Sequence, residues 1–252
     1  MTGQIRTELN DHVLELVFDR PDKLNAFTMA MYQALVEGFE RAGRDPEVRV
    51  VLLSGSGGTF TAGNDITDFM NQPMGGGSDH PTLRFLHHLV DCEKPIVAAV
   101  DGPAIGIGTT MLLHCDYVVA TRGAKFRMPF VPLGLVPEGG SSVLLPRRIG
   151  HAAAGELLLL GDVFSAERAQ SLALVNQVVD GGAASLVMSS RAIAQRFAEQ
   201  PPEALQASKA LLRARDRAEL HQVIDEEARV FAERLRSPEA LEALASFVQR
   251  KK

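Results

Sequence analysis

The sequence has few of the residues on which disulfide-bonded and metal-binding proteins depend. Its 252 residues include two cysteines and no tryptophan. Cys92 and Cys115 are too few for a disulfide framework, and neither lies in a C-x-x-C pair or at zinc-finger spacing from a histidine. We therefore expect two buried thiols in a reducing compartment and no metal site.

Long apolar runs and an excess of positive charge are also missing. No window reaches the roughly 18 apolar residues of a membrane span, and the first residues show no apolar signal core. Lys and Arg number 26 against 31 Asp and Glu, so the net charge of −5 provides no positive field for a phosphate backbone. We expect a cytoplasmic protein with neither a membrane nor a nucleic acid as its partner.

The sequence is rich in apolar residues that follow secondary-structure periods. At 46% hydrophobic residues, the chain can bury enough surface to offset the entropy of folding. Thr28 is placed to cap a helix whose Leu35, Val36 and Phe39 share one face. Helical patterns separate segments that are typical of strands, at 13–18, 48–54, 96–100 and 117–120. This alternation predicts an α/β fold with parallel pairing.

The second half of the chain is predicted to be mostly helical. Beyond residue 152 the pattern is helical almost throughout, with a capped start at 165–168. We expect one continuous domain, with a core over 1–195 and a C-terminal helical region over 196–252. The glycine- and proline-rich segment 71–81 is expected to be a mobile loop, a candidate lid. A helical basic set is expected to face solvent: Lys209, Arg213, Arg215 and Arg217.

A glycine-rich turn, Asp101 to Met111, follows the strand at 96–100 and opens a helix. The first amides of a helix lack intrahelical acceptors, so a negative group can bind there. A dinucleotide fingerprint is a poorer interpretation, because Met111 occupies the third glycine position. The alternative is a tight turn that binds nothing.

A second loop, 60–66, contains Gly63 directly before a helical turn that Asn64 or Asp65 would cap. Taken alone, the loop is better explained by capping. Taken together with the region of Gly106, it suggests that amides from two loops converge on one oxygen.

Glu138 is the only ionisable residue between Arg127 and Arg147, in a segment with three prolines. Burial in such an apolar segment raises the pKa of a carboxyl group toward neutral pH, as a general base requires. The alternative is a carboxylate that interacts favourably with the dipole of the following helix.

Together, segments 20–26, 60–66, 94–102 and 134–140 resemble, in this order, the crotonase (enoyl-CoA hydratase/isomerase) superfamily. The resemblance implies a spiral of β-β-α units and a C-terminal helical region that mediates trimerisation, giving a homotrimer or a dimer of trimers. It implies an acyl-CoA thioester as substrate, with no cofactor besides the coenzyme A of that substrate. The backbone amides of Ala62 and Ile107 would form the oxyanion hole.

The resemblance also implies which residues bind the acyl-CoA. Arg250 is expected at a phosphate of a neighbouring subunit's ligand, with an ordinary basic terminus as the alternative. The complete expected set is Lys23, Leu24, Ala26, Ala62, Gly63, Asn64, Asp65, Ile66, Gly106, Phe130, Leu133 and Arg250.

Departures from the family pattern narrow the expected reaction. The two glutamates of the hydratases are replaced by Thr110 and Phe130, whereas Glu138 matches the base of the peroxisomal-type Δ3,Δ2-enoyl-CoA isomerases. We therefore expect one base to move a proton from C2 to C4 through a dienolate. Three alternatives stay open: a 1,2-epoxyphenylacetyl-CoA isomerase, an enoyl-CoA hydratase and a catalytically silent acyl-CoA-binding module.

Overall fold

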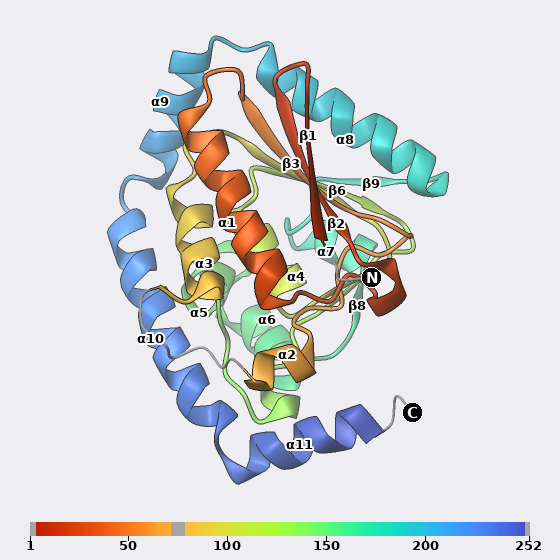
Figure 1. Cartoon of the computed structure of the whole chain (residues 1–252), viewed down its shortest axis with the longest axis vertical. Coiled ribbons are helices and arrows are strands. Elements are labelled where there is room, and N and C mark those ends of the chain that lie inside the picture. The colour runs from red at the N-terminus through yellow and green to blue at the C-terminus, as the bar shows by residue number, and fades with distance from the viewer. Residues whose placement is uncertain (1–3, 72–78, 250–252) are drawn as a thin grey trace.

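A computed structural model of the chain describes residues 4–71 and 79–249. Its centre is a six-stranded sheet in the order β1-β2-β3-β4-β6-β9 (Figure 1). The strand β1 is antiparallel to β2, and all other neighbours are parallel. The strands are β1 (Gln4–Asn10), β2 (Val13–Asp19), β3 (Val50–Gly55), β4 (Ile96–Val100), β6 (Tyr117–Thr121) and β9 (Gln177–Val179).

Short extended segments that follow strands of the large sheet along the chain form a second layer. It contains β5 (Pro103–Ile105), β7 (Lys125–Arg127) and β8 (Phe164–Ser165). Isolated parallel bridges, Phe27 with Asn64 and Thr61 with Ala104, continue this layer. Each turn therefore runs from the large sheet through the second layer into a helix, which is the β-β-α spiral expected from the sequence.

The two capped helix starts predicted from the sequence are confirmed. The Thr28 hydroxyl accepts a hydrogen bond from Met31 N, and that of Ser165 accepts one from Arg168 N. The helices are α1 (Met29–Arg44), α2 (Ile66–Asn71), α3 (Pro81–Asp91), α4 (Ile107–Thr110), α5 (Ser141–Ile149), α6 (His151–Gly155), α7 (Ala166–Ser171), α8 (Gly182–Ala198), α9 (Pro202–Arg213), α10 (Arg217–Leu235) and α11 (Pro238–Gln249). Short 3-10 turns are η1 (Pro21–Lys23), η2 (Met111–His114) and η3 (Val131–Leu133), and a π turn is η4 (Glu156–Leu160).

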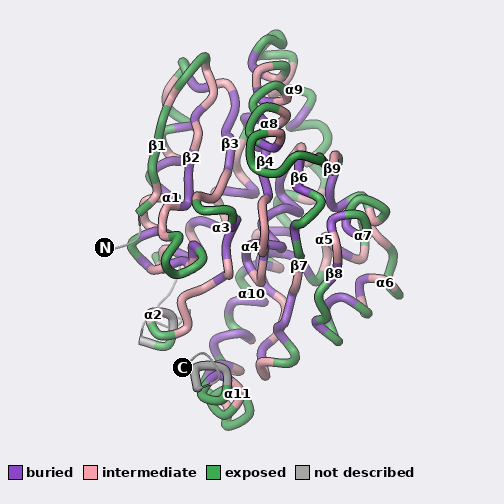
Figure 2. Tube along the Cα trace, turned by 90° about the vertical axis from the view of Figure 1, so that its right-hand side faces the viewer, coloured by how far each residue is buried: buried purple, intermediate pink, exposed green. Residues whose placement is uncertain are grey.

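The large sheet separates two hydrophobic cores, and its inner strands β2, β3, β4 and β6 consist mostly of buried residues (Figure 2). Side chains of a strand alternate between its faces, so Val50 and Leu52 of β3 pack with α8, whereas Val51 and Leu53 join the larger core with α1 and α3. Because both faces are buried, the strand is a continuous apolar run and not an alternating one.

The expected boundary between the core and the C-terminal helical region, after residue 195, falls inside α8, which ends at Ala198. The chain is not helical at 199–201, between α8 and α9. Helix α10 packs against α3, where the Nδ1 atoms of His87 and His221 lie 2.5 Å apart.

Two expectations concern residues outside those described: the loop at 71–81, of which 72–78 are not described, and Arg250. Over 4–71 and 79–249, no helix is long and apolar enough to cross a membrane.

Candidate active site

Glu138 lies in the turn between η3 and α5, and only 3% of it is exposed. Thr110 Oγ1, from the end of α4, donates a hydrogen bond to Glu138 Oε1 at 2.6 Å. No other hydrogen bond to this carboxyl group is found among the described residues. Its second oxygen, Oε2, is therefore available to take a proton.

The surroundings of Glu138 make it a base at neutral to alkaline pH. Burial is the largest influence and raises the pKa of Glu138 to about 8. The hydrogen bond from Thr110 lowers this pKa, and the charge of Glu227 raises it further. Sequence reasoning predicted the direction of the shift from the apolar neighbours of Glu138, and the structure confirms it.

The turn that carries Glu138 is held by side chains from distant segments. Gly139 and Gly140 both have positive φ, 70° and 76°. His114 Nε2 lies 2.7 Å from Gly139 O, and burial lowers the pKa of this histidine to about 4, so the neutral ring donates that hydrogen bond. Glu227 accepts hydrogen bonds from Gly140 N at 2.7 Å and from Ser142 N at 2.9 Å. Sequence analysis missed His114 and Glu227, because neither has a local pattern that marks it.

The first glycine-rich loop leaves an amide free at the start of α4. Gly106 has a φ of 58°, and its N–H donates to Arg127 O. The next amide, that of Ile107, has no hydrogen-bond acceptor in the described part of the chain. This agrees with the expected role of Ile107 as a donor to a ligand oxygen.

In the second loop, one of the amides expected to bind the ligand oxygen is not free. The Ala62 N–H donates to Leu24 O at 2.9 Å, so it is occupied within the protein, and this contradicts its expected place in the oxyanion hole. Phe27 pairs with Gly63 O and Asp65 N, which turns the Asn64 amide to the opposite side. Over residues 4–71 and 79–249 the Asn64 amide has no acceptor, so the unpaired amide of this loop is that of Asn64 and not that of Ala62.

Several contacts bring the two loops and Glu138 together. A Cβ on Gly63 would lie 2.8 Å from Ile105 O, and one on Gly108 would lie 2.6 Å from Thr61 Cγ2. Tyr32 OH donates to Asn64 Oδ1 at 2.5 Å, and the charge of Glu138 contributes to the raised pKa of Tyr32. The free amides and the base therefore belong to one site.

The segments expected to bind coenzyme A are also neighbours. Arg20 pairs with Asp65 at 2.7 Å, which ties the η1 loop with Lys23, Leu24 and Ala26 to the Gly63 loop. Asp65 Oδ1 accepts hydrogen bonds from the amides of residues 67 and 68, so the expected cap of this helical turn is Asp65 and not Asn64.

Two apolar residues of the expected site, Phe130 and Leu133, lie at η3, in the segment that precedes Glu138. Phe130 is buried with its ring 6.5 Å from that of Phe231 on α10, and Leu133 is half-buried. Where the structure describes the chain, no three His, Cys, Asp or Glu side chains are grouped to hold a metal ion.

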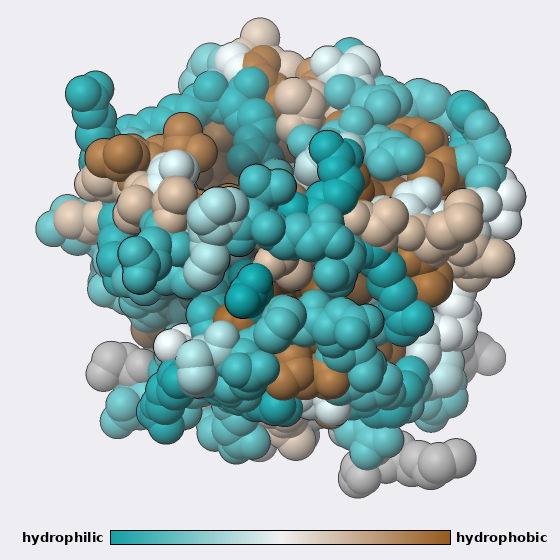
Figure 3. Space-filling model, turned by 90° about the horizontal axis from the view of Figure 1, so that it is seen from above, coloured by the Kyte–Doolittle hydropathy of each residue, from teal (hydrophilic) through white to brown (hydrophobic). Residues whose placement is uncertain are grey.

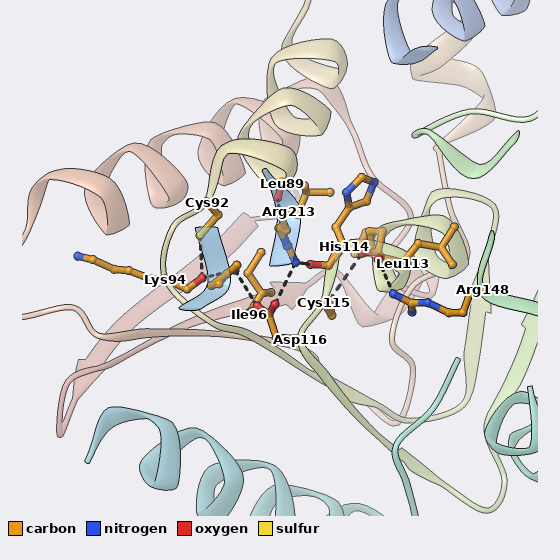
Figure 4. A network of polar contacts seen from close by, with 12 residues as sticks. Leu89, Cys92, Lys94, Ile96, Leu113, His114, Cys115, Asp116, Arg148 and Arg213 are labelled. Atoms are coloured by element: carbon orange, nitrogen blue, oxygen red, sulfur yellow. Dashed lines mark hydrogen bonds and ion pairs between the residues drawn. The ribbon is translucent and has the colours of Figure 1, made fainter. Parts of the chain in front are cut away.

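The basic residues expected on one solvated helix face do not share a helix: Lys209 and Arg213 lie on α9, Arg215 in the following turn, and Arg217 at the start of α10. Lys209 is buried, and its Nζ donates to Asp116 Oδ2 at 2.6 Å. Arg213 donates to Asp116 Oδ1 at 3.0 Å and also reaches His114 O (Figure 4). The prediction of solvent exposure is wrong for Lys209, which is buried, and for Arg213, which is half-buried, because Asp116 compensates both charges. Arg215 and Arg217 are exposed as expected, although Arg217 pairs with Asp91 at 2.8 Å.

The spiral of β-β-α turns, with its two unpaired amides and a buried carboxyl group, has the fold of the crotonase superfamily. The family model described as enoyl-CoA hydratase/isomerase matches residues 8–252, and the chain belongs to this family.

Proteins with different named activities are similar to this chain in sequence. Human enoyl-CoA delta isomerase 2 is 36% identical over 96% of this chain, which spans only 62% of the length of that relative. The 1,2-epoxyphenylacetyl-CoA isomerase of Escherichia coli K12 is 38% identical over 78% of this chain and 77% of its own length. The solved structure of Pseudomonas aeruginosa OdaA is 49% identical over 96% of this chain and 98% of that chain, with a TM-score of 0.93.

Proposed function

We propose that this protein is a Δ3,Δ2-enoyl-CoA isomerase. The observation that carries the proposal is the single buried carboxyl group of Glu138, hydrogen-bonded through one oxygen and beside two unpaired amides. The similarity to enoyl-CoA delta isomerases over nearly the whole chain supports it.

In the proposed reaction Glu138 Oε2 takes a proton from C2 of a 3-enoyl-CoA. The electron pair of the broken C–H bond moves into the C2–C3 region and the thioester carbonyl, giving a dienolate. The same oxygen returns the proton to C4, so the double bond moves to C2–C3 and no group is gained or lost. A positioned base of this kind contributes about 100- to 10,000-fold in rate.

The negative oxygen of the dienolate would be held by the N–H groups of Asn64 and Ile107. Such preorganised donors contribute about 3 kcal/mol each, because they bind the charge that develops in the transition state. Binding of coenzyme A by the loops at 23–26 and 62–66, and a homotrimeric assembly, remain predictions from the family.

Hydration of 2-enoyl-CoA is a weaker candidate. Adding water requires carboxylates that hold and activate that water, and Thr110 and Phe130 occupy the positions where the resemblance expects them. The buried Phe130 side chain excludes water from its surroundings.

Isomerisation of a ring epoxide is the second candidate, since a relative with that activity is 38% identical. The resemblance expects an aspartate at the position of Glu138 in such enzymes, and the longer side chain here favours the enoyl substrate.

The test is turnover of 3-hexenoyl-CoA, 2-hexenoyl-CoA and 1,2-epoxyphenylacetyl-CoA by the wild type and by Glu138→Gln. We expect the wild type to isomerise 3-hexenoyl-CoA fastest and the variant to lose about 100- to 10,000-fold of that rate. The glutamine keeps the size of the side chain and removes its basicity. Rapid hydration of 2-hexenoyl-CoA, or near wild-type isomerisation by the variant, would refute the proposal.

A further inference from the structure

Glu227 is a buried acid that the proposed reaction does not use. It lies in the middle of α10 and is 8% exposed. Each of its oxygens accepts a backbone hydrogen bond, Oε2 from Gly140 N and Oε1 from Ser142 N. No lysine, arginine or histidine forms an ion pair with it in the described residues. Its neighbour Glu226 is exposed and lies 3.9 Å from Arg229.

The position of Glu227 compensates for a missing local cap. Helix α5 begins after Gly140, which has no side chain to accept the first free N–H groups of the helix. Glu227 supplies that acceptor from 87 residues further along the chain. Hydrogen bonds to a carboxylate are shorter and stronger than neutral ones, so this contact fixes the two glycines directly after Glu138.

We propose that Glu227 is a positioning residue for Glu138: it fixes the turn that carries the base, and when it is ionised its charge also acts on the base. The inference rests on the proposed function, in which Glu138 is the base. It adds a residue of the C-terminal helix α10 to the group of residues, Glu138, Thr110, Asn64 and Ile107, that come from the spiral core.

The charge of Glu227 affects the pKa of Glu138, which a purely structural contact would not do. Two carboxylates in a poorly solvated site repel each other, so the ionised form of Glu138 is disfavoured while Glu227 is charged. Among the described residues, the Thr110 hydroxyl contacts Glu138, Tyr32 interacts with its charge, and the neutral ring of His114 contacts the next residue, Gly139. No cation among the described residues acts on the pKa of Glu138.

The experiment measures kcat/KM for 3-hexenoyl-CoA against pH in the wild type, Glu227→Gln, Glu227→Asp and Glu226→Gln. For Glu227→Gln we expect the rising limb of the profile to move to lower pH by about half a unit to one unit. Glu227→Asp keeps the negative charge, but its shorter side chain cannot hold the Gly140 and Ser142 amides as well. We therefore expect kcat to fall, while the rising limb shifts less than in Glu227→Gln. Glu226→Gln, an exposed change on the same helix, leaves the profile unchanged.

A readout that needs no turnover accompanies the kinetics. The carboxyl carbons are followed by 13C NMR across pH, and the signal absent from Glu138→Gln assigns Glu138. We expect this signal to titrate at lower pH in Glu227→Gln than in the wild type. If Glu227→Gln does not fold, the wild-type signal decides, because coupling to Glu227 produces a second inflection in its titration curve.

An unchanged or upward-shifted limb in a folded Glu227→Gln, or a one-site wild-type curve where that variant does not fold, contradicts the inference. These outcomes differ from failure of the proposed function, in which the wild type itself does not isomerise 3-hexenoyl-CoA.

Discussion

At the residue scale, the chemistry of this protein depends on one carboxyl group and on the groups that touch it. Thr110 stands where the resemblance expects a hydratase glutamate, and its hydroxyl donates to Glu138 instead. Residue 110 therefore does not supply a second carboxylate here, and instead orients the carboxyl group of Glu138. This leaves a single oxygen of Glu138 to carry a proton.

Thr110→Val is expected to weaken the base while preserving its shape. Loss of a hydrogen bond to a charged group removes about 1.5–3 kcal/mol, which raises the pKa of Glu138 by about one to two units. The pH profile of kcat/KM should move upward, and activity at pH 7 should fall about tenfold or more. Thr110→Ser keeps the hydroxyl and should behave like the wild type. A Val variant with the wild-type profile would show that the hydrogen bond has no catalytic role.

At the element scale, the two glycine-rich loops lie close together because their main chains are in direct contact. Gly63 has a φ of 88°, and a Cβ there would lie 2.8 Å from Ile105 O. Only glycine fits both the dihedral angle and the close approach. The sequence pattern suggested that both loops converge, and the family resemblance implied the amide of Ala62 as one donor. Neither could show that this amide pairs with Leu24 O, because that pairing is a tertiary contact.

Gly63→Ala is expected to destabilise the protein and to displace the Asn64 amide. Backbone strain of this type costs about 1–3 kcal/mol, and the loss of an oxyanion donor costs about 100- to 1,000-fold in kcat. Gly43→Ala is the matched control, because a Cβ there meets nothing within 4 Å near the end of α1. It should stabilise the protein by up to about 1 kcal/mol. Thermal unfolding and kcat measure both effects, and equal behaviour of the two variants would contradict the argument.

At the scale of the whole molecule, stability and activity depend on the same buried charge. The exposed face in Figure 3 is largely hydrophilic, with hydrophobic side chains in separate small groups. By contrast, burial raises the pKa values of both Glu138 and Glu227 inside the fold. A carboxyl group whose pKa is raised by folding stabilises the native state at low pH. That contribution is lost as pH rises from its unfolded value, near 4.5, through its folded value, about 8 for Glu138.

Glu138→Gln should therefore be more stable than the wild type at alkaline pH. We expect the difference in Tm between the variant and the wild type to grow between pH 5 and pH 9. The reason is that only the wild type must ionise a buried group over this interval, at about 1.4 kcal/mol for each unit of pKa shift. Calorimetry at several pH values measures the difference. A Tm difference that is constant with pH would show that Glu138 is not shifted.

The sequence by itself determined four central strands, the capped helices, the glycine-rich loops and the apolar surroundings of Glu138, because each depends on neighbours a few residues away; the choice of Glu138 as the base came from the family resemblance. Apolar runs, caps such as Thr28 and the isolated acid at 138 are local patterns. The tertiary structure alone decided which amides stay unpaired and which side chains hold the base, since these follow from contacts between distant segments. Lys209 with Asp116, Ala62 with Leu24 and Glu227 with Gly140 are such contacts, and a burial or a hydrogen bond across the fold leaves no mark on the residues beside it.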